Sequence, residues 1–236
     1  MSEADPRAEL AELTIALQAE LERETLRGRL RAPFCTGLTA PPASPQALAA
    51  SCQNLSELRA VVADCRACKL CNTRQQTVFA DGTGSARVMF IGEAPGANED
   101  AQGIPFVGDA GKLLTDIITK GMKLRREDVY ITNVLKCRPP ENRDPEHAEK
   151  ELCTHFLDRQ IELVNPEVLI PLGEHASAHI LSSQLSMDQM RGKVHVVNGR
   201  KVVPTYHPAH LLRDKSKKRD CWQDIQLALE ILGEVR

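Results

Sequence analysis

A short apolar segment that runs directly into a glycine- and proline-rich turn constrains the fold of this chain more than any other feature. The segment spans residues 87–91, and the turn spans residues 92–100. A short apolar run bounded by turn residues is typical of a strand buried on both faces of a parallel sheet. Open α/β sheets bind their ligands at the carboxyl ends of such strands, so the turn is a candidate ligand site. Taken alone, it also fits an ordinary connection between a strand and a helix.

The side chains of this turn indicate what it binds. The turn carries three acids, Glu93, Glu99 and Asp100, and no lysine. It lacks both the Gly-Lys-Ser/Thr ending of a P-loop and the glycine spacing of a dinucleotide-binding turn. An acidic turn is a poor cradle for phosphate. It suits the positioning of a water molecule or the binding of a neutral polar ring.

Strand and helix patterns alternate along the rest of the chain. Strands are expected near residues 87–91, 129–134 and 167–172, a hairpin with an Asn-Gly turn at 194–203, and helices near 55–63, 109–121, 145–163, 174–182 and 219–232. Strands separated by helices favour a parallel sheet that is covered on both faces. The predicted fold is therefore α/β, a three-layer α/β/α sandwich with a central, mostly parallel four-stranded sheet.

Three regions are expected along the chain. Residues 1–28 repeat apolar positions at helical spacing and predict an amphipathic helix, which we expect to dock loosely or to bind an unidentified protein. Residues 29–54 are rich in Pro and Ala and predict a linker. Residues 55–236 then form the main domain, which we expect to be monomeric.

Composition narrows the cellular setting. No apolar run approaches the about 20 residues that span a bilayer, and the N-terminus lacks the pattern of a signal peptide. We therefore expect a cytoplasmic protein without membrane contact, in which the eight cysteines serve as thiols or metal ligands rather than as disulfides.

The charge is unevenly distributed although the formal net charge is only −2. Residues 1–27 are predominantly acidic, whereas residues 191–219 are rich in Lys and Arg and contain one acid, Asp214. Such an asymmetry fits a basic patch that faces nucleic-acid phosphates, and it also fits a basic face that is merely solvated.

Five cysteines form two groups with the spacing of metal ligands. Cys65 and Cys68 make a CxxC motif followed by Cys71, and Cys137 and Cys153 lie far downstream. Four thiolates from two distant pairs can enclose zinc or an iron–sulfur cluster, and spacing alone does not decide between them. Cys71 extends the first motif to the opening of a ferredoxin run, but no fourth cysteine and proline follow it.

Four blocks occur in an order that is found together in one family. They are the turn at 92–100, the segment 103–108 with its aromatic Phe106, the strand and loop at 129–140, and the His-Pro segment at 207–212. With the cysteines, these blocks resemble the uracil-DNA glycosylase superfamily over residues 60–232, and the iron–sulfur branch called family 4 in particular.

The resemblance implies an activity and a cofactor. The implied enzyme flips uracil out of single- or double-stranded DNA and hydrolyses its N-glycosidic bond, which leaves an abasic site for base excision repair. The implied cofactor is a [4Fe–4S] cluster of structural role held by Cys65, Cys68, Cys137 and Cys153. The alternative is a non-catalytic DNA-binding or redox-responsive repair module of the same fold, with a structural four-cysteine metal site.

The resemblance also assigns the pocket residues. Asn133 would read the edge of the base, because a carboxamide offers both a donor and an acceptor to uracil. Phe106 would stack on the base, and His207 would stabilise the charge that develops on the departing uracil. The turn residues Glu93, Ala94 and Pro95 complete the expected uracil site.

The attacking water needs an orienting group. Some relatives carry an Asp at the third position of the turn, where this chain has Ala94. That departure leaves Glu93 and Glu99 as the candidate catalytic acids, with Glu99 preferred and Asp100 in reserve; either acid could instead hold the loop.

Two further segments are expected to contact DNA. Arg138 and Arg143 flank a stiff proline-containing loop next to the proposed cluster ligands. Leu211 is the expected wedge that fills the space left by the flipped nucleotide. The expected phosphate contacts are Arg213, Lys215, Lys217 and Lys218.

Overall fold

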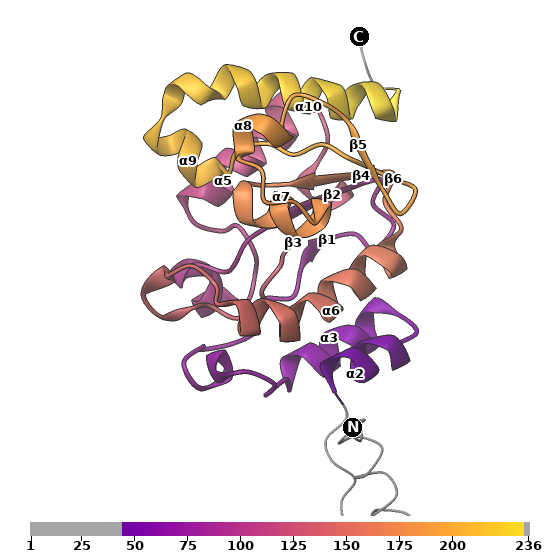
Figure 1. The fold of residues 1–236 in the computed structure, drawn as a ribbon, viewed down its shortest axis with the longest axis vertical. Helices are drawn as coiled ribbons and strands as arrows, with labels where there is room; N and C mark the ends of the chain where they lie inside the picture. Colours follow the sequence, from indigo (N-terminus) through magenta and orange to yellow (C-terminus); the bar gives the residue numbers. More distant parts are fainter. Residues whose placement is uncertain (1–43, 234–236) are drawn as a thin grey trace, which may run out of the picture. The chain divides into compact units, whose positions relative to one another are not determined.

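The structure is a computed structural model that describes residues 44–233, drawn in Figure 1. The predicted helix at 1–28 and the first part of the predicted linker at 29–54 lie outside the described residues. A single mixed sheet organises the described part of the chain. Its strands are β1 (Asp81–Gly82), β2 (Val88–Gly92), β3 (Tyr130–Asn133), β4 (Val168–Pro171), β5 (His195–Val197) and β6 (Arg200–Val202).

The sheet has a parallel centre and two antiparallel edges. The strand order is β1-β3-β2-β4-β6-β5, in which β3, β2, β4 and β6 are parallel neighbours. The edge strands β1 and β5 run antiparallel to β3 and β6. The predicted sandwich is confirmed, but the predicted count of four strands is wrong, because the sheet has six. The two-residue strand β1, Asp81–Gly82, lacks the apolar pattern that makes a strand visible in a sequence.

Helices cover both faces of this sheet (Figure 1). The described α-helices are α2 (Pro45–Ser51), α3 (Leu55–Ala63), α4 (Ala97–Gln102), α5 (Asp109–Asp116), α6 (His147–Val164), α7 (Glu174–Leu181), α8 (Met187–Met190), α9 (Pro208–Arg213) and α10 (Lys218–Leu232). Helix α10 lies on one face, and α6 with α3 and α2 lies on the other. Helix α5 continues into a wider π turn at Ile117–Gly121, so the predicted helix at 109–121 is present in two pieces.

The core consists of two clusters, because the side chains of each buried strand point alternately to the two faces of the sheet. In β2, Val88 and Phe90 belong to the cluster under α10, whereas Met89 and Ile91 belong to the cluster under α6. Successive side chains of a strand point to opposite faces, so a fully apolar strand supplies both layers at once. This double burial explains why residues 88–91, which follow Arg87, form one continuous apolar run.

Two helix boundaries differ from those that the sequence indicates. The helix expected near residues 145–163 begins at His147, with Glu146 as its cap, and Glu149 reaches back to Glu146 in a capping box. Residues 45–51, assigned by composition to the linker, form α2, which begins with Ser44 as its cap and Pro45 in its first turn. The expected domain boundaries stay a prediction. Within residues 44–233, no helix combines the length and the hydropathy needed to cross a membrane.

Candidate active site

A cavity of about 660 Å³ opens at the carboxyl ends of β2, β3 and β4. This is the edge where parallel sheets place their ligands, as the turn at 92–100 predicted. All the residues expected to bind uracil or to act in catalysis line this cavity: Glu93, Ala94, Pro95, Glu99, Phe106, Asn133 and His207. The four sequence blocks therefore meet in one site.

Gly92 brings the base-reading and stacking candidates together. It pairs with Asn133 across the β2–β3 ladder. A Cβ atom on Gly92 would lie 2.2 Å from Oδ1 of Asn133 and 2.6 Å from Cζ of Phe106, far inside van der Waals contact. The absence of a side chain here is what lets the amide and the aromatic ring occupy adjacent positions.

The backbone of Phe106 is held in an unusual conformation. Its φ angle is 55°, in the left-handed region that aromatic residues rarely adopt. Gly111 of α5 packs against it so closely that a Cβ there would lie 1.8 Å from the Phe106 carbonyl oxygen. Arg126 donates a hydrogen bond of 2.8 Å to the carbonyl of Pro105. These contacts maintain a strained residue at the cavity wall, as is common in binding sites.

Asn133 presents an unpaired acceptor to the cavity. Its side chain is buried, and Oδ1 accepts no hydrogen bond from any described residue. Its backbone carbonyl accepts a 2.6 Å hydrogen bond from Nζ of buried Lys136. The backbone amides of Val134 and Leu135 bond the carbonyls of Gly92 and Glu93, which ties the strand end to the turn. A fixed, buried and unpaired amide oxygen is the condition expected of a group that awaits a ligand.

His207 is a neutral imidazole with a defined proton. It lies before Pro208 at the start of α9, and its Nδ1 accepts a 3.1 Å hydrogen bond from the backbone N–H of Ala209. Burial and the positive charge of Arg213 lower the pKa of His207 to about 4. With Nδ1 accepting, the proton of the neutral ring is on Nε2. The Phe106 and His207 ring centroids are 5.6 Å apart.

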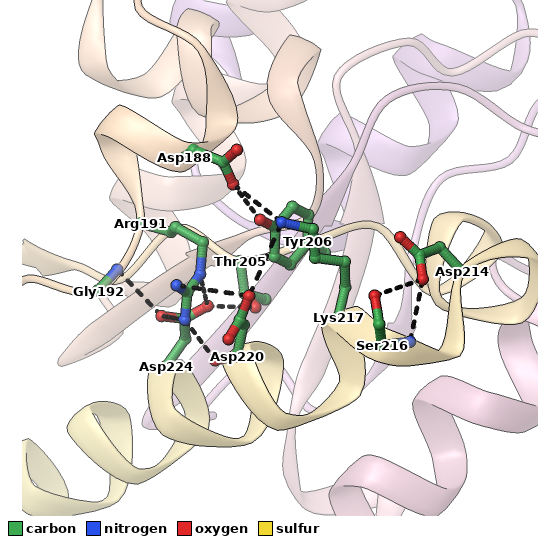
Figure 2. Close-up of polar contacts among 10 residues, drawn as sticks. All are labelled: Asp188, Arg191, Gly192, Thr205, Tyr206, Asp214, Ser216, Lys217, Asp220 and Asp224. Atoms are coloured by element: carbon green, nitrogen blue, oxygen red, sulfur yellow. Dashed lines mark hydrogen bonds and ion pairs between the residues drawn. The ribbon is translucent and has the colours of Figure 1, made fainter.

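A polar network holds Thr205 and Tyr206, the two residues that precede His207 in the chain (Figure 2). Buried Asp224 of α10 accepts a 2.8 Å hydrogen bond from Thr205 and two from Arg191. Tyr206, next along the chain, donates a hydrogen bond to Asp188. The residues before His207 are thus fastened to both α10 and α8.

Glu99 is fully engaged by the backbone. Its Oε1 accepts hydrogen bonds from the N–H groups of Val107 (2.9 Å) and Gly108 (3.0 Å), and its Oε2 accepts one from Gly96 (3.1 Å). These bonds join the turn at 92–100 to the Phe106 segment. Glu99 therefore holds the loop, the second role that the sequence allowed.

Of the two candidate catalytic acids, Glu93 is the one that remains available to the cavity. Burial raises the pKa of its carboxyl group, and the neighbouring His175 opposes that rise. Nε2 of His175 lies 3.8 Å from Oε1 of Glu93 and 3.9 Å from Oδ2 of Asp144. Sequence patterns do not single out His175, since one histidine four residues after a strand makes no motif.

The two arginines of the proline loop differ in their surroundings. Arg143 lines the cavity and makes a bidentate ion pair with buried Glu149, at 2.9 and 2.6 Å. Arg138 donates a 2.8 Å hydrogen bond to Asn142. Arg143 is thereby committed to shaping the loop, although it remains partly exposed at the cavity rim.

In helix α9, the residue that we expected to act as the wedge is buried. Leu211 is 1% exposed and packs in the core under α10, so it is not positioned to enter a duplex. Leu212 beside it is 42% exposed. Adjacent helix residues point about 100° apart, and in α9 this turns Leu212 toward the exposed side while Leu211 faces the core.

The residues that we expected to contact phosphates differ in how exposed they are. Lys215 and Lys218 are exposed, as is Arg213 at the cavity rim. Lys217 instead lies over the ring of Tyr206, 5.2 Å from its centroid, with Asp188 at 3.5 Å (Figure 2).

The predicted cysteine ligands meet at a second, small cavity of about 10 Å³, within the core cluster under α6. Cys65, Cys68, Cys137 and Cys153 line it, and so does Cys71. The remaining wall is largely apolar and includes Val62, Ala67, Leu152 and Phe156. Arg74 donates a hydrogen bond of 3.0 Å to the sulfur of Cys137. Burial raises the pKa of Cys137 to about 11 and that of Cys153 to about 12.

Comparisons with known proteins agree with this arrangement. Residues 79–226 match the profile of the Uracil DNA glycosylase superfamily. A type-4 uracil-DNA glycosylase of Thermotoga maritima is 44% identical, over 71% of this chain and 88% of the relative. Proteins of the same name from Saccharolobus solfataricus and Sulfurisphaera tokodaii are 43% and 41% identical, over 76% and 75% of this chain and 87% and 84% of theirs.

Proposed function

The chain belongs to the uracil-DNA glycosylase superfamily, and on that basis we propose how its cavity excises uracil from DNA. Its reaction is the hydrolysis of the bond between C1′ of the sugar and N1 of the base, in DNA repair. That bond is inaccessible inside a duplex, so the nucleotide must be turned out into the cavity. The non-catalytic alternative is not favoured, since the relatives carry glycosylase names.

Asn133 reads the base. The buried, unpaired Oδ1 accepts the N3–H of uracil, and the NH₂ of the same amide donates to O4. Cytosine presents an acceptor and a donor in reversed order at these positions and leaves both contacts unmade. This orphaned acceptor is the single observation that carries the proposal.

Phe106 and the turn hold the base in place. The ring of Phe106 stacks on the face of uracil, and its strained but packed backbone keeps it there before the ligand arrives. Ala94 and Pro95 form the adjacent wall. A site built in advance places the base without further ordering cost.

His207 stabilises the leaving group. As the C1′–N1 bond breaks, the bonding electrons pass to the base, and negative charge gathers on O2 and O4. The Nε2–H of neutral His207 donates to O2 of the departing anion. A neutral donor strengthens its hydrogen bond as that charge grows, so its effect falls mainly on the transition state.

Glu93 orients the water. Its carboxylate accepts a hydrogen bond from the water that attacks C1′ and takes up the released proton. Glu99 contributes by fixing the turn through its three backbone hydrogen bonds. We therefore assign the water to Glu93 and the loop geometry to Glu99.

Exposed cations next to the cavity hold the DNA. Arg213, Lys215 and Lys218 contact phosphates, and the half-buried Arg138 and Arg143 of the proline loop add positive charge beside them. Leu212 replaces Leu211 as the side chain that enters the space left by the base.

The cysteine cavity suits the [4Fe–4S] cluster that the family resemblance implies. Cys65, Cys68, Cys137 and Cys153 would hold it, and such thiolates carry negative charge that N–H donors stabilise. The guanidinium of Arg74 supplies one such donor to Cys137, and the amide of Lys136 supplies another to Cys153, at 3.4 Å. Bound there, the group would tie residues 65–68 to the strand end that carries Asn133.

A single assay tests the reaction. An oligonucleotide with one uracil, incubated with the full chain and treated with alkali, should be cut at the uracil position. The same sequence with thymine or cytosine there should stay intact. Intact uracil DNA after incubation with folded, iron-loaded protein would leave only DNA binding. The cytoplasmic location on the nucleoid, the monomeric state and a partner for residues 1–28 stay predictions.

A further inference from the structure

His175 lies between the catalytic turn and the proline loop. It belongs to the first turn of α7, after Gly173, and its side chain is 42% exposed. Its Nε2 reaches Glu93 at 3.8 Å on one side and Asp144 at 3.9 Å on the other. The three ionisable groups come from three separate segments, and all of them line the cavity.

Burial and three neighbouring ionisable groups act on the carboxyl group of Glu93. Burial raises the pKa of Glu93, and so does the negative charge of Asp144. Two groups oppose them, Lys150 from α6 and His175 from α7 in its protonated form, of which His175 has the larger effect. The Asp144 side chain is 82% exposed, so water screens it more than it screens Glu93, which is 28% exposed.

Resting on the role proposed above for Glu93, we propose that His175 is a positioning residue that keeps Glu93 ionised and turned toward the attacking water. The distance of 3.8 Å exceeds that of a hydrogen bond, so the contact acts through charge rather than through a shared proton. His175 itself touches neither the base nor the sugar in this scheme.

The direction of the pH effect follows from the charges. Excision requires ionised Glu93, so the rate falls as the pH drops through the pKa of Glu93. A positive His175 favours the ionised carboxylate and displaces that fall to lower pH. Removal of His175 should therefore displace the acidic limb of the rate profile to higher pH.

Four variants test this. Single-turnover excision is measured from pH 5 to 8 for His175→Gln, His175→Lys, Glu93→Gln and the double variant His175→Gln with Glu93→Gln. In His175→Gln the acidic limb of the rate profile should shift to higher pH by about 0.5–1 pH unit. At a given pH on that limb, the rate should therefore be about three- to tenfold lower. His175→Lys restores a positive charge and should return the limb to its original place.

The control is His147→Gln, which makes the same exchange at an exposed residue of α6 outside the cavity. It should leave the profile unchanged, and thermal melting should show each variant folded. In the Glu93→Gln background, removal of His175 should have no further effect, because the group it acts on is gone.

The outcomes separate this inference from the proposed function. A full rate in Glu93→Gln would overturn the role of Glu93 and the inference with it. A slow Glu93→Gln together with an unmoved limb in His175→Gln would overturn the inference alone. Equal losses from His175→Gln in both backgrounds would mean that His175 is merely structural, which also overturns it.

Discussion

Gly92 and Asn133 face each other on adjacent parallel strands, and a single added carbon on Gly92 would lie 2.2 Å from Oδ1 of Asn133. The same carbon would overlap the ring of Phe106. The position of the base-reading amide therefore depends on the lack of a side chain on the neighbouring strand.

Gly92→Ala should displace Asn133 and Phe106 together. A displacement of about 1 Å in a catalytic site can cost about 100-fold in rate, and we expect a loss of that size in single-turnover excision. Gly84→Ala is the control, since a Cβ there would meet the flexible end of Leu55 at 2.6 Å outside the cavity. If Gly92→Ala excised uracil as fast as Gly84→Ala, the packing argument would fail.

Asn133→Asp should weaken discrimination and activity together. A carboxylate only accepts hydrogen bonds, so it loses the donor to O4 of uracil and can accept from the amino group of cytosine. Excision of uracil should fall, and its ratio to excision of cytosine should fall too. Parallel time courses on the two oligonucleotides measure both rates; an unchanged ratio would show that another group reads the base.

His207→Ala should slow the chemical step with little effect on DNA binding. The loss of one donor to a developing oxyanion costs about 10²–10³-fold in rate. Single-turnover rates and a filter-binding titration separate the two effects. Retention of the rate in His207→Ala would contradict the mechanism even though the family assignment would stand.

His207 should stay neutral throughout the working range of pH. Its folded pKa of about 4 lies below the ordinary value of 6.5. The unfolded state therefore binds more protons in that window, and stability contributed by neutral His207 is lost as the pH falls from 6.5 toward 4. Nuclear magnetic resonance of the imidazole should show no titration near 6.5, and a titration there would contradict the burial argument.

The cysteine cavity should hold iron. Purified without air, the full chain should be brown and carry about four irons. Replacing Cys65, Cys68, Cys137 or Cys153 by Ala should remove the colour, whereas Cys71→Ala should keep it. Stoichiometric zinc without iron would disprove the cluster, and colour lost in Cys71→Ala would add a fifth thiol to the candidate ligands.

DNA affinity should fall with salt through specific lysines. Replacing Lys215 and Lys218 by Ala should flatten the log–log slope of affinity against salt by up to about 1.8 units, at about 0.9 per phosphate. Lys217→Ala should change it less, because Asp188 and Tyr206 already engage that ammonium group. Fluorescence anisotropy at several salt concentrations measures each slope. Equal changes of the slope for all three lysines would contradict the smaller role assigned to Lys217.

Short sequence patterns predicted the strands and turns of the sheet, because these elements depend mainly on residues that are neighbours in the chain. The apolar run at 88–91 indicates a doubly buried strand, and the Asn198-Gly199 turn, with both φ angles positive, joins β5 to β6 as the sequence indicated. The placement of Phe106, Asn133 and His207 at one cavity followed from the family resemblance.

What the sequence left open depends on contacts between distant segments. The role of Glu99 is decided by amides at Val107 and Gly108, which no spacing rule connects to it. The choice between Leu211 and Leu212 depends on which side of α9 faces the core. The edge strand β1 is too short to show a pattern.

The unpaired amide oxygen of Asn133 also has a consequence for the end of the reaction. The oxygen accepts no hydrogen bond from the described residues, and a buried acceptor gains stability when a ligand supplies a well-placed donor. Any molecule that offers N3–H in the cavity supplies such a donor, and free uracil is such a molecule. Turnover should therefore slow as uracil accumulates, and added uracil should raise the melting temperature, because the contact that selects the substrate also delays the release of its product.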